Sequence, residues 1–378
     1  MSEKIESKIR DLQERLDKIQ INKATERGAL YIKSQIAKLR NDLIKYSSQK
    51  SGGGGGFTVK KSGDAQVAFI GFPSVGKSSL LNLLTHGNTE SRVAAYDFTT
   101  LKAIPGMMEI KQAKIQLIDL PGIILGAAAG KGRGKEILGH TRTADLILII
   151  ICYKDDGTID FKDLEHIRKE LHGANIRLNQ KPARIKIKKM NKGGIGFSYN
   201  GPQKLDREDV KTIMNELGYS NASVYFSSKN VTADQLIDKV MDNRVYTPEL
   251  VVINKSDLAD NKLSKKEITE KIGHENWIEV SAKEKTNIKE LRNRVFENLK
   301  LIRIYLKPPG EDADMEEPII LQKGATIEDL CKSLHKSFVK KYRYSMVWGE
   351  SAKHPGQRFK KMDHVLKDKD IVSIYQRR

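Results

Sequence analysis

A short stretch of the chain has the residue types and spacing of a loop that binds a nucleoside triphosphate. Residues 71–78 read G-x-x-x-x-G-K-S, between an apolar run and a helix-compatible stretch. The glycines let backbone N–H groups turn toward phosphates, and the start of the helix adds partial positive charge. In this motif Lys77 would reach the β- and γ-phosphates and the Ser78 hydroxyl would bind Mg²⁺. We expect the phosphates on Gly71, Phe72, Pro73, Ser74, Val75, Gly76, Lys77, Ser78 and Ser79.

Two further motifs can complete the phosphate and metal site. The sequence Asp119-Leu120-Pro121-Gly122 follows an apolar run, so the carboxylate of Asp119 can hold the Mg²⁺ shell through a water and the Gly122 N–H can contact the γ-phosphate. Residues 96–101 read Y-D-F-T-T-L, and a hydroxyl there would bind Mg²⁺ only while the γ-phosphate is present, as in a switch. We choose Thr100 over Thr99 as that ligand. The predicted metal ligands are Ser78, Thr100 and Asp119, and the predicted catalytic groups are Lys77, Thr100 and Gly122.

The sequence Asn254-Lys255-Ser256-Asp257 follows another apolar run and indicates the base. The carboxylate of Asp257 can accept hydrogen bonds from the ring N–H and the amino group of guanine, and adenine lacks this pair of donors. A site whose buried acceptors stay unpaired rejects the analogue by roughly 10⁴–10⁵. Lys255 can lie over the base, and Asn254 can tie this loop to the phosphate loop. Ser281, Ala282 and Lys283 can offer a backbone N–H to the guanine carbonyl, and we therefore expect GTP and GDP as ligands.

The residue after Gly122 bears on the rate of hydrolysis. Ras-like enzymes have a glutamine there that orients the attacking water, whereas this chain has Ile123, which cannot hydrogen-bond a water. We expect slow hydrolysis by the protein alone, with help from another switch residue, a monovalent cation, a second protein or the ribosome. The basic, glycine-rich residues 126–134 follow. Either Arg133 or His140 approaches the phosphates, or this loop merely moves.

The motifs are positioned by strands and helices that alternate from about residue 62. Apolar runs typical of buried strands lie at 67–70, 115–118, 146–152, 250–253 and 277–280. The alternation predicts an α/β P-loop domain with a largely parallel sheet, whose functional loops follow the carboxyl ends of the strands. We assign residues 62–175 and 245–300 to this domain.

The N-terminal residues 1–50 predict a helical hairpin. Their apolar side chains recur at three- and four-residue spacing, and Gly28 lies near the expected break between two antiparallel helices. The basic residues of the hairpin either hold RNA or form a solvated face. Residues 51–61 contain five consecutive glycines and predict a flexible linker.

Residues 176–244 interrupt the P-loop domain and predict an inserted α+β subdomain. We expect a hairpin of strands at 184–190 and 195–199, followed by a helix, a strand and a helix at 207–217, 222–226 and 233–240. The first strand carries several basic residues and no acid, and strand alternation places much of this charge on one face. That face either contacts phosphate backbones or is simply solvated.

Residues 302–378 predict a compact mixed domain. Strands are expected at 302–306, 318–321, 342–348 and 371–375, with a helix at 326–334 capped by Thr326. The end of this domain is again basic.

The overall charge favours a polyanionic partner. The 378 residues carry a net charge of +19 and a pI near 9.6, which is typical of proteins that contact RNA or ribosomes. Two cysteines exclude a disulfide framework and a four-cysteine zinc site. The N-terminal residues are charged, so we expect no signal peptide. The longest apolar run is too short to span a membrane, and we therefore expect a cytoplasmic protein. No specificity for DNA is expected.

These motifs together resemble one family. G-F-P-S-V-G-K-S, Y-D-F-T-T-L, D-L-P-G-I-I and N-K-S-D, with residues 364–372 near the C-terminus, are similar to the developmentally regulated GTP-binding proteins, in the Obg group of GTPases. The resemblance implies an N-terminal helical hairpin, an S5-like insertion and a C-terminal TGS domain with a β-grasp fold. It implies the nucleotide-binding roles given above, and an apolar residue at Ile123 fits the wider group.

The resemblance also implies partners and a cofactor. Ribosome association, a role in translation and, in eukaryotic members, a regulatory partner protein are features of the family. Several related GTPases bind K⁺ through an asparagine of the phosphate loop, where this chain has Ser74. The expected cofactor is Mg²⁺, with K⁺ as a second candidate. The competing hypothesis is an RNA- or ribosome-binding scaffold in which hydrolysis of GTP is incidental.

Overall fold

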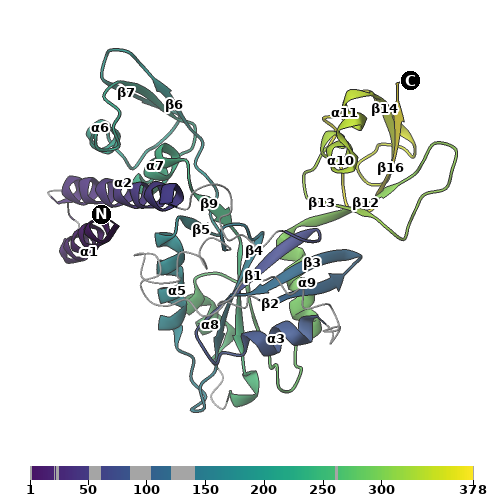
Figure 1. Cartoon of the computed structure of the whole chain (residues 1–378), viewed down its shortest axis with the longest axis horizontal. Helices are drawn as coiled ribbons and strands as arrows, with labels where there is room; N and C mark the ends of the chain where they lie inside the picture. Colours follow the sequence, from purple (N-terminus) through teal and green to yellow (C-terminus); the bar gives the residue numbers. More distant parts are fainter. Residues whose placement is uncertain are drawn as a thin grey trace. The chain divides into compact units, whose positions relative to one another are not determined.

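The computed structural model describes residues 2–20, 22, 25–50, 61–85, 104–120, 141–259 and 263–377 (Figure 1). Two compact units divide the chain: one comprises 1–59, 124–142 and 166–247, and the other 60–123, 143–165 and 248–378. The linker residues 51–60 and the expected switch and catalytic residues Thr100, Gly122, Ile123, Arg133 and His140 lie outside the described residues.

A six-stranded sheet forms the centre of the second unit, and its strand order is β11-β10-β4-β1-β3-β2. Five strands run parallel, and β2 pairs antiparallel with β3 at one edge. This arrangement confirms the predicted α/β fold with a largely parallel sheet, although the edge strand β2 was not predicted. The strands are β1 (Ala65–Ile70), β2 (Ile104–Ile110), β3 (Ala113–Asp119), β4 (Leu146–Cys152), β10 (Glu249–Asn254) and β11 (Trp277–Glu279).

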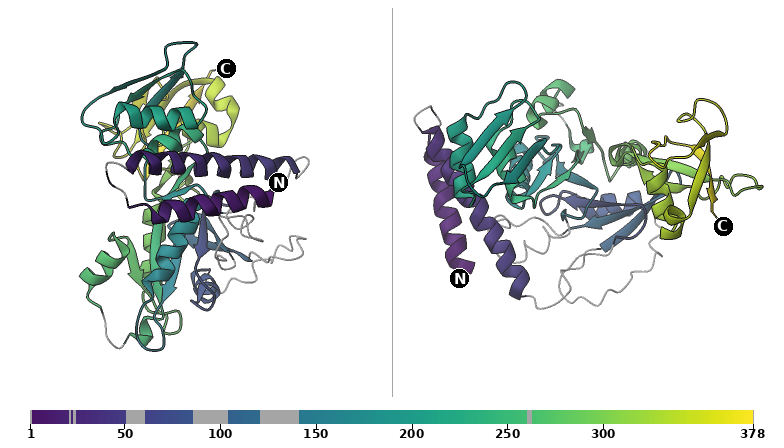
Figure 2. Two further views of the ribbon diagram at one scale, coloured as in Figure 1. Left: turned by 90° about the vertical axis from the view of Figure 1, so that its left-hand side faces the viewer. Right: turned by 90° about the horizontal axis from the view of Figure 1, so that it is seen from above.

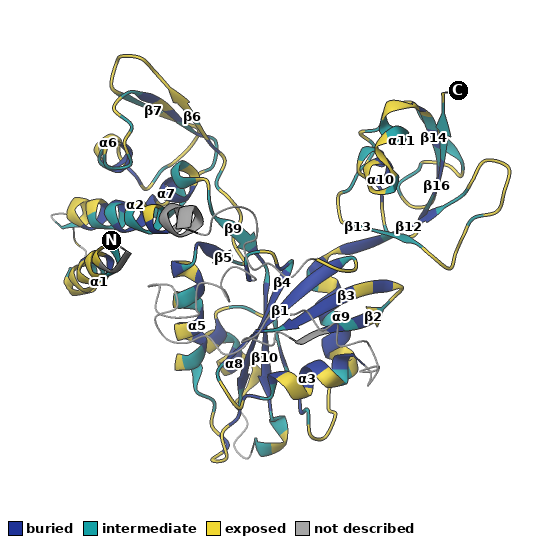
Figure 3. Ribbon diagram, viewed as in Figure 1, coloured by how far each residue is buried: buried dark blue, intermediate teal, exposed yellow. Residues whose placement is uncertain are grey.

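Burial on both faces explains why the central strands read as continuous apolar runs. Every residue of β1 and β10 is buried, as Figure 3 shows in dark blue. The helices α3 (Lys77–Leu84) and α9 (Ile288–Leu299) contribute leucines, valine and phenylalanine to the core cluster that contains the strand residues Val67, Phe69 and Leu148. Two further helical elements of this unit are the 3₁₀ turn η2 (Ser256–Leu258) and α8 (Lys265–Ile272). The helix α5 (Phe161–Gly173) begins in this unit and continues into the first unit.

The C-terminal residues form a five-stranded sheet with the order β13-β12-β16-β14-β15, drawn in yellow-green colours in Figure 2. The expected helix begins after Thr326, whose side chain accepts the backbone N–H of Asp329 in a capping box. The sequence did not predict α11 or β15. The elements are β12 (Leu301–Leu306), β13 (Ile319–Gln322), α10 (Ile327–Leu334), α11 (Lys336–Lys340), β14 (Tyr342–Trp348), β15 (Gln357–Phe359) and β16 (Asp370–Gln376).

The first unit begins with two helices, α1 (Ser2–Lys18) and α2 (Glu26–Lys50), which lie side by side and share a small apolar core (Figures 1 and 2). The break between them comes before residue 26, so the expectation of a break near Gly28 was wrong by a few residues. Gly28 lies inside α2, where a Cβ would meet nothing within 4 Å. The connection between the helices ends at Thr25, whose backbone N–H and hydroxyl both donate hydrogen bonds to the side-chain oxygen of Asn22.

The inserted segment contains a three-stranded sheet, and the predicted hairpin is not formed. The strand β8 (Ala222–Phe226) lies between β6 (Ile185–Lys189) and β7 (Ile195–Tyr199), antiparallel to the first and parallel to the second. The reason is burial: β8 supplies three fully buried apolar side chains to the core, whereas the lysine-rich β6 suits an edge. The helices α6 (Arg207–Glu216) and α7 (Ala233–Met241) pack in the same core.

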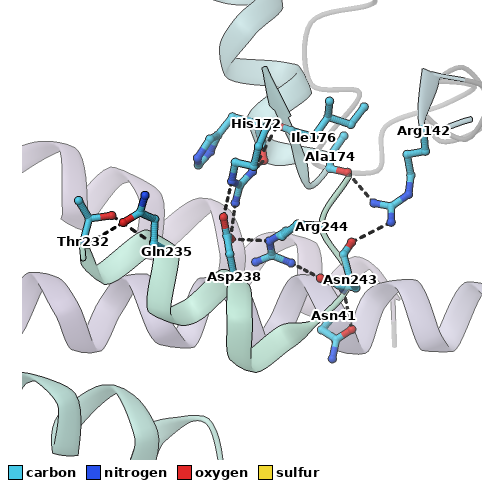
Figure 4. A network of polar contacts seen from close by, with 11 residues as sticks. Asn41, Arg142, His172, Ala174, Ile176, Thr232, Gln235, Asp238, Asn243 and Arg244 are labelled. Atoms are coloured by element: carbon cyan, nitrogen blue, oxygen red, sulfur yellow. Dashed lines mark hydrogen bonds and ion pairs between the residues drawn. The ribbon is translucent and has the colours of Figure 1, made fainter. Parts of the chain in front are cut away.

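A buried polar network holds the base of the insertion (Figure 4). Short strands β5 (Ile176–Leu178) and β9 (Val245–Thr247) pair in parallel there. The guanidinium of Arg177 donates two hydrogen bonds of 2.7 Å to the carboxylate of Asp238, and Arg244 donates a third. Burial lowers the pKa of the neighbouring His172 to about 4, with the charge of Arg177 as the second cause. In the described part of the chain, no helix combines the length and apolarity needed to cross a bilayer.

Candidate functional site

The predicted motifs converge because they follow neighbouring parallel strands of the six-stranded sheet. The loop at 71–76 follows β1, Asp119 ends β3, Asn254 ends β10 and residues 280–283 follow β11. The carboxyl ends of parallel strands lie at the same edge of a sheet. β1 lies between β4 and β3, and at this point the chain connections lead to opposite halves of the sheet. Four separate sequence motifs are thereby brought to one edge.

The loop after β1 needs its two glycines for close approach. A Cβ on Gly71 would lie 2.4 Å from the carbonyl oxygen of Ile150, and one on Gly76 would lie 2.2 Å from the side-chain nitrogen of Asn254. Gly76 also has a φ of 90°, in the left-handed region. Ser74 has a φ of 65°, which is uncommon for a residue other than glycine. The backbone of this loop therefore has a tightly determined shape.

The side chain of Lys77 lies back across its own loop. Its Nζ donates to the carbonyl oxygens of Gly71 at 3.0 Å and Phe72 at 2.9 Å. Burial lowers the pKa of Lys77, and the nearby carboxylate of Asp119 acts in the opposite direction. The lysine stands at the first residue of α3, so its ammonium and the helix N-terminus both favour an anion at the same place.

Ser78 and Asp119 form a pair of oxygen ligands suited to a hard cation. The Ser78 Oγ donates to Asp119 Oδ2 at 2.8 Å, and Asp119 Oδ1 is buried without a hydrogen-bond partner among the described residues. Mg²⁺ usually takes one or two carboxylates and keeps several waters. These residues fit such an ion. No cluster of three or more histidine, cysteine, aspartate or glutamate ligands occurs in the part of the chain that the structure describes.

Asn254 joins three loops through one buried side chain. Its Nδ2 donates to the carbonyl oxygen of Val75 at 2.8 Å, and its Oδ1 accepts the backbone N–H of Ala282 at 3.1 Å. The residue is only 1% exposed, so neither bond is replaced by water. The phosphate loop and the loop after β11 are thus fixed relative to each other.

Asp257 is held by Ser281 from the neighbouring loop. The Ser281 Oγ donates to Asp257 Oδ1 at 2.5 Å and accepts the backbone N–H of Glu284 at 3.0 Å. This hydrogen bond lowers the pKa of Asp257, whose carboxylate is exposed. Lys255, at the start of η2, has a left-handed φ of 59°, and Lys283 is exposed. The carboxylate of Asp257 and the side chains of Lys255 and Lys283 therefore lie on two adjacent loops, those after β10 and β11.

Tyr153 and Glu279 support this region and were not predicted. The hydroxyl of the buried Tyr153 donates to Glu279 Oε1 at 2.5 Å, and its backbone N–H donates to the carbonyl oxygen of Asn254. Burial and this hydrogen bond raise the pKa of Tyr153. Asn287 donates to the Glu279 carbonyl at 2.9 Å. In the sequence Tyr153 merely follows an apolar run, which gave no signal of a polar role.

Comparison with known protein families divides the chain into three matched regions. Residues 66–189 match the family described as "50S ribosome-binding GTPase", 192–301 match the family described as the C-terminal region of that domain, and 302–376 match the TGS domain. The last match confirms the predicted C-terminal domain.

Similar proteins extend over the full length. An uncharacterized GTP-binding protein of Methanocaldococcus jannaschii is 48% identical over 99% of this chain and 93% of its own. Developmentally-regulated GTP-binding protein 1 of Xenopus laevis is 42% identical over 98% of this chain and 99% of its own. Ribosome-interacting GTPase 1 of Saccharomyces cerevisiae is 39% identical over 98% of both chains. Among solved structures, the Schizosaccharomyces pombe YchF GTPase is 14% identical, covers 84% of this chain and 99% of its own, and has a TM-score of 0.46.

Proposed function

The chain belongs to the family of the developmentally regulated GTP-binding proteins and is a GTPase, and from this premise we propose how it binds GTP and where it acts. GTP binds across residues 71–79, 254–257 and 281–283. It is hydrolysed with Mg²⁺, slowly by the protein alone. The protein acts in the cytoplasm as a switch associated with ribosomes or their RNA during translation.

The observation that carries the choice of base is the bonded pair Asp257 and Ser281. Ser281 takes only one of the carboxylate's oxygens, Oδ1, and favours the ionised form. Each carboxylate oxygen has more than one lone pair, so the group can still accept from the ring N–H and the amino group of guanine. The backbone N–H groups of 281–283 and the lysines Lys255 and Lys283 complete the base side. Adenine would leave these acceptors unpaired.

The phosphate side uses residues of the loop and of α3. When GTP binds, the ammonium of Lys77 leaves the carbonyl oxygens of Gly71 and Phe72 and donates to phosphate oxygens instead. The new hydrogen bonds are stronger because both partners are charged. Ser78 and Asp119 would hold Mg²⁺, directly and through water, with Thr100 as a third ligand. When bound, the ion neutralises charge on the transferred phosphate. Lys77, Thr100 and the Gly122 N–H then stabilise the charge that develops on the γ-phosphate.

The slow rate follows from Ile123. An isoleucine side chain cannot orient the attacking water, and an added electrostatic group is worth roughly 10³–10⁵ in rate. We propose the ribosome as the main source of this help. A K⁺ ion and a regulatory partner protein are two further sources of help. Equal rates of GTP turnover in Na⁺ and in K⁺ would rule out the K⁺ ion.

Association with ribosomes is supported by charge and by the relatives. The net charge of +19 suits a polyanion. The names of the yeast relative and of the matching family both refer to ribosomes.

The deciding experiment measures GTP turnover with and without ribosomes. We expect ribosomes to raise the turnover rate at least tenfold, and unchanged turnover would contradict an assisted switch. Co-sedimentation with ribosomes should be strong with a non-hydrolysable GTP analogue and weak with GDP. Equal binding in all nucleotide states would favour the scaffold hypothesis, in which hydrolysis is incidental.

A further inference from the structure

The C-terminal sheet has one covered face and one face that presents aromatic and cationic side chains. Val347 and Val372 lie opposite each other on β14 and β16 and are buried in a core with Leu330 of α10. The residues that alternate with them point to the other face. These are the facing pairs Tyr344 and Tyr375, Met346 and Ser373, and Trp348 and Ile371, together with Arg358, which pairs with Met346 from β15.

Three planar groups on this second face form one stack. The rings of Tyr344 and Tyr375 are 4.4 Å apart between centroids and inclined by only 12°. The guanidinium of Arg358 lies over the Tyr344 ring at 3.7 Å, and that of Arg343 approaches the same ring at 5.9 Å. Close to parallel ring stacking is suited to adding another flat group at either end of the stack.

Positive charge surrounds the stack. The strands β14, β15 and β16 contain a single acid, Asp370, which is fully buried and accepts the backbone N–H groups of Lys367 and Ser351. Lys307 lies over the ring of Trp348 at 6.0 Å. Exposed basic residues on and directly next to these strands are Lys341, Arg343, Arg358, Lys360, Lys361, Lys369 and Arg377, and the connections between the strands carry the exposed acids Glu350 and Asp363.

We propose that this face of the C-terminal sheet binds a single-stranded segment of RNA, whose unpaired bases stack on Arg358 and Tyr375. The inference rests on the proposed association with ribosomes or RNA and names the part of the RNA that is recognised. Only unpaired bases can offer their planes to such a stack, whereas base-paired RNA exposes mainly phosphates and hydroxyl groups. The basic residues beside the stack hold the backbone.

Two other roles would use the same side chains. Cross-strand aromatic pairs also stabilise a sheet by themselves, and tyrosine with arginine is common at protein interfaces. Neither role accounts for the excess of exposed basic residues over exposed acids on these strands and their connections. Charge complementarity therefore favours the nucleic acid, and both alternatives become outcomes of the test.

The test measures affinity of the full-length protein for three labelled RNAs by fluorescence anisotropy. They are a 12-nucleotide oligouridylate, an abasic ribose-phosphate strand of equal length and a 12-base-pair duplex. Stacking contributes roughly 1–3 kcal/mol per base, so the oligouridylate should bind at least about 5-fold more tightly than the abasic strand. Equal affinity for these two strands, or tighter binding of the duplex, would overturn the proposal.

Variants separate stacking from charge. Arg358→Lys keeps the charge but removes the plane, and Tyr375→Leu keeps an apolar side chain; each should weaken binding of the oligouridylate about 5-fold or more and leave the abasic strand unaffected. The control is Lys361→Ala, which should weaken both strands alike and lower the salt dependence by about one counterion. Unchanged melting temperatures confirm folding, and Arg358 is exposed, so its replacement by lysine leaves the core intact.

Ribosome co-sedimentation of the same proteins distinguishes this inference from the proposed function. If the wild type sediments with ribosomes but does not prefer the oligouridylate, the stacking proposal fails and the proposed function stands. If Arg358→Lys then also loses ribosomes, the face binds a protein. If the wild type does not sediment with ribosomes in any nucleotide state, the proposed function fails independently.

Discussion

The base side and the phosphate side of the proposed nucleotide site are held in different ways. On the base side, Asn254 bonds to the backbone of two other loops and Ser281 bonds to Asp257, and these hydrogen bonds remain when guanine binds. On the phosphate side, Lys77 and Ser78 bond to groups that a phosphate or a metal ion would replace. The first side is preorganised for selection, whereas the second exchanges partners on binding. We therefore expect changes on the phosphate side to alter overall affinity and changes on the base side to alter specificity.

The largest loss of overall nucleotide affinity, without a change of base preference, is expected from Lys77→Ala. A buried charge pair with a phosphate is worth roughly 2–5 kcal/mol, so affinity for GTP should fall by about 30-fold or more. The measurement is a binding titration with a fluorescent GTP analogue. Lys265→Ala, at an exposed lysine of α8, is the control and should bind like the wild type. Normal affinity in Lys77→Ala would place the phosphates elsewhere.

Asp257→Asn should change which base is accepted. The amide offers one acceptor and one donor, which match the ring N–H and the carbonyl of xanthine rather than the two donors of guanine. Turnover of GTP should fall by roughly 10³ or more, because a donor of guanine then faces a donor. XTP should be hydrolysed in its place. A variant that loses both activities but unfolds at a lower temperature would indicate a structural role only.

Asn254→Ala tests the connection between the two sides. It leaves the buried carbonyl oxygen of Val75 and the N–H of Ala282 without partners, at a cost of roughly 1–3 kcal/mol. Affinity for GDP and GTP should fall together by about 5- to 100-fold, with no change of base preference. Asn287→Ala, which removes a hydrogen bond at the nearby Glu279 carbonyl, serves as the comparison and should have a smaller effect.

Tyr153→Phe should loosen the base side slightly. Only the hydroxyl that bonds to Glu279 is removed, and a hydrogen bond contributes a net 0.5–1.5 kcal/mol, so affinity should fall about 2- to 10-fold. If the loss of this bond shifts the loop after β11, the preference for GTP over ITP, which lacks the amino group of guanine, should also weaken. An unchanged ratio of the two affinities would assign Tyr153 to stability alone.

The smallest effect at neutral pH is expected from Ser281→Ala. The hydrogen bond from Ser281 lowers the pKa of Asp257, and guanine needs the ionised carboxylate. Binding is therefore lost as pH falls through this pKa, and without the serine the loss should begin at a higher pH. GDP affinity measured across the acidic range checks this prediction. Identical pH profiles for variant and wild type would contradict it.

Prediction from the sequence succeeded where local pattern and tertiary structure agree. The apolar run at 146–152 predicted β4 to the residue, because a strand buried on both faces must be apolar throughout. The site motifs were predictable because each occupies a short, continuous segment after such a strand. The helix cap at Thr326 is likewise a local signal.

Pairing over longer distances was not predictable in the same way. Residues 184–199 have turn residues between two strands and therefore predicted a hairpin, but the more apolar β8 takes the central position. Neither the edge strand β2 nor the Tyr153–Glu279 hydrogen bond has a local pattern. The hydrogen bond joins residues that are distant in sequence and meet only in the folded sheet. β2 pairs instead with the adjacent β3 across a tight turn at Lys111 and Gln112, whose residues are not one of the pairs that favour such a turn.

The most direct test of the account compares the melting temperatures of the wild type and Asp257→Asn with GDP, XDP and ADP, each with Mg²⁺. A nucleotide that binds the folded state raises the melting temperature according to its affinity. We predict that GDP alone stabilises the wild type and that XDP alone stabilises the variant. Stabilisation of the wild type by ADP as strong as that by GDP, or a folded variant that still prefers GDP, would contradict the assignment of Asp257 as the residue that selects guanine.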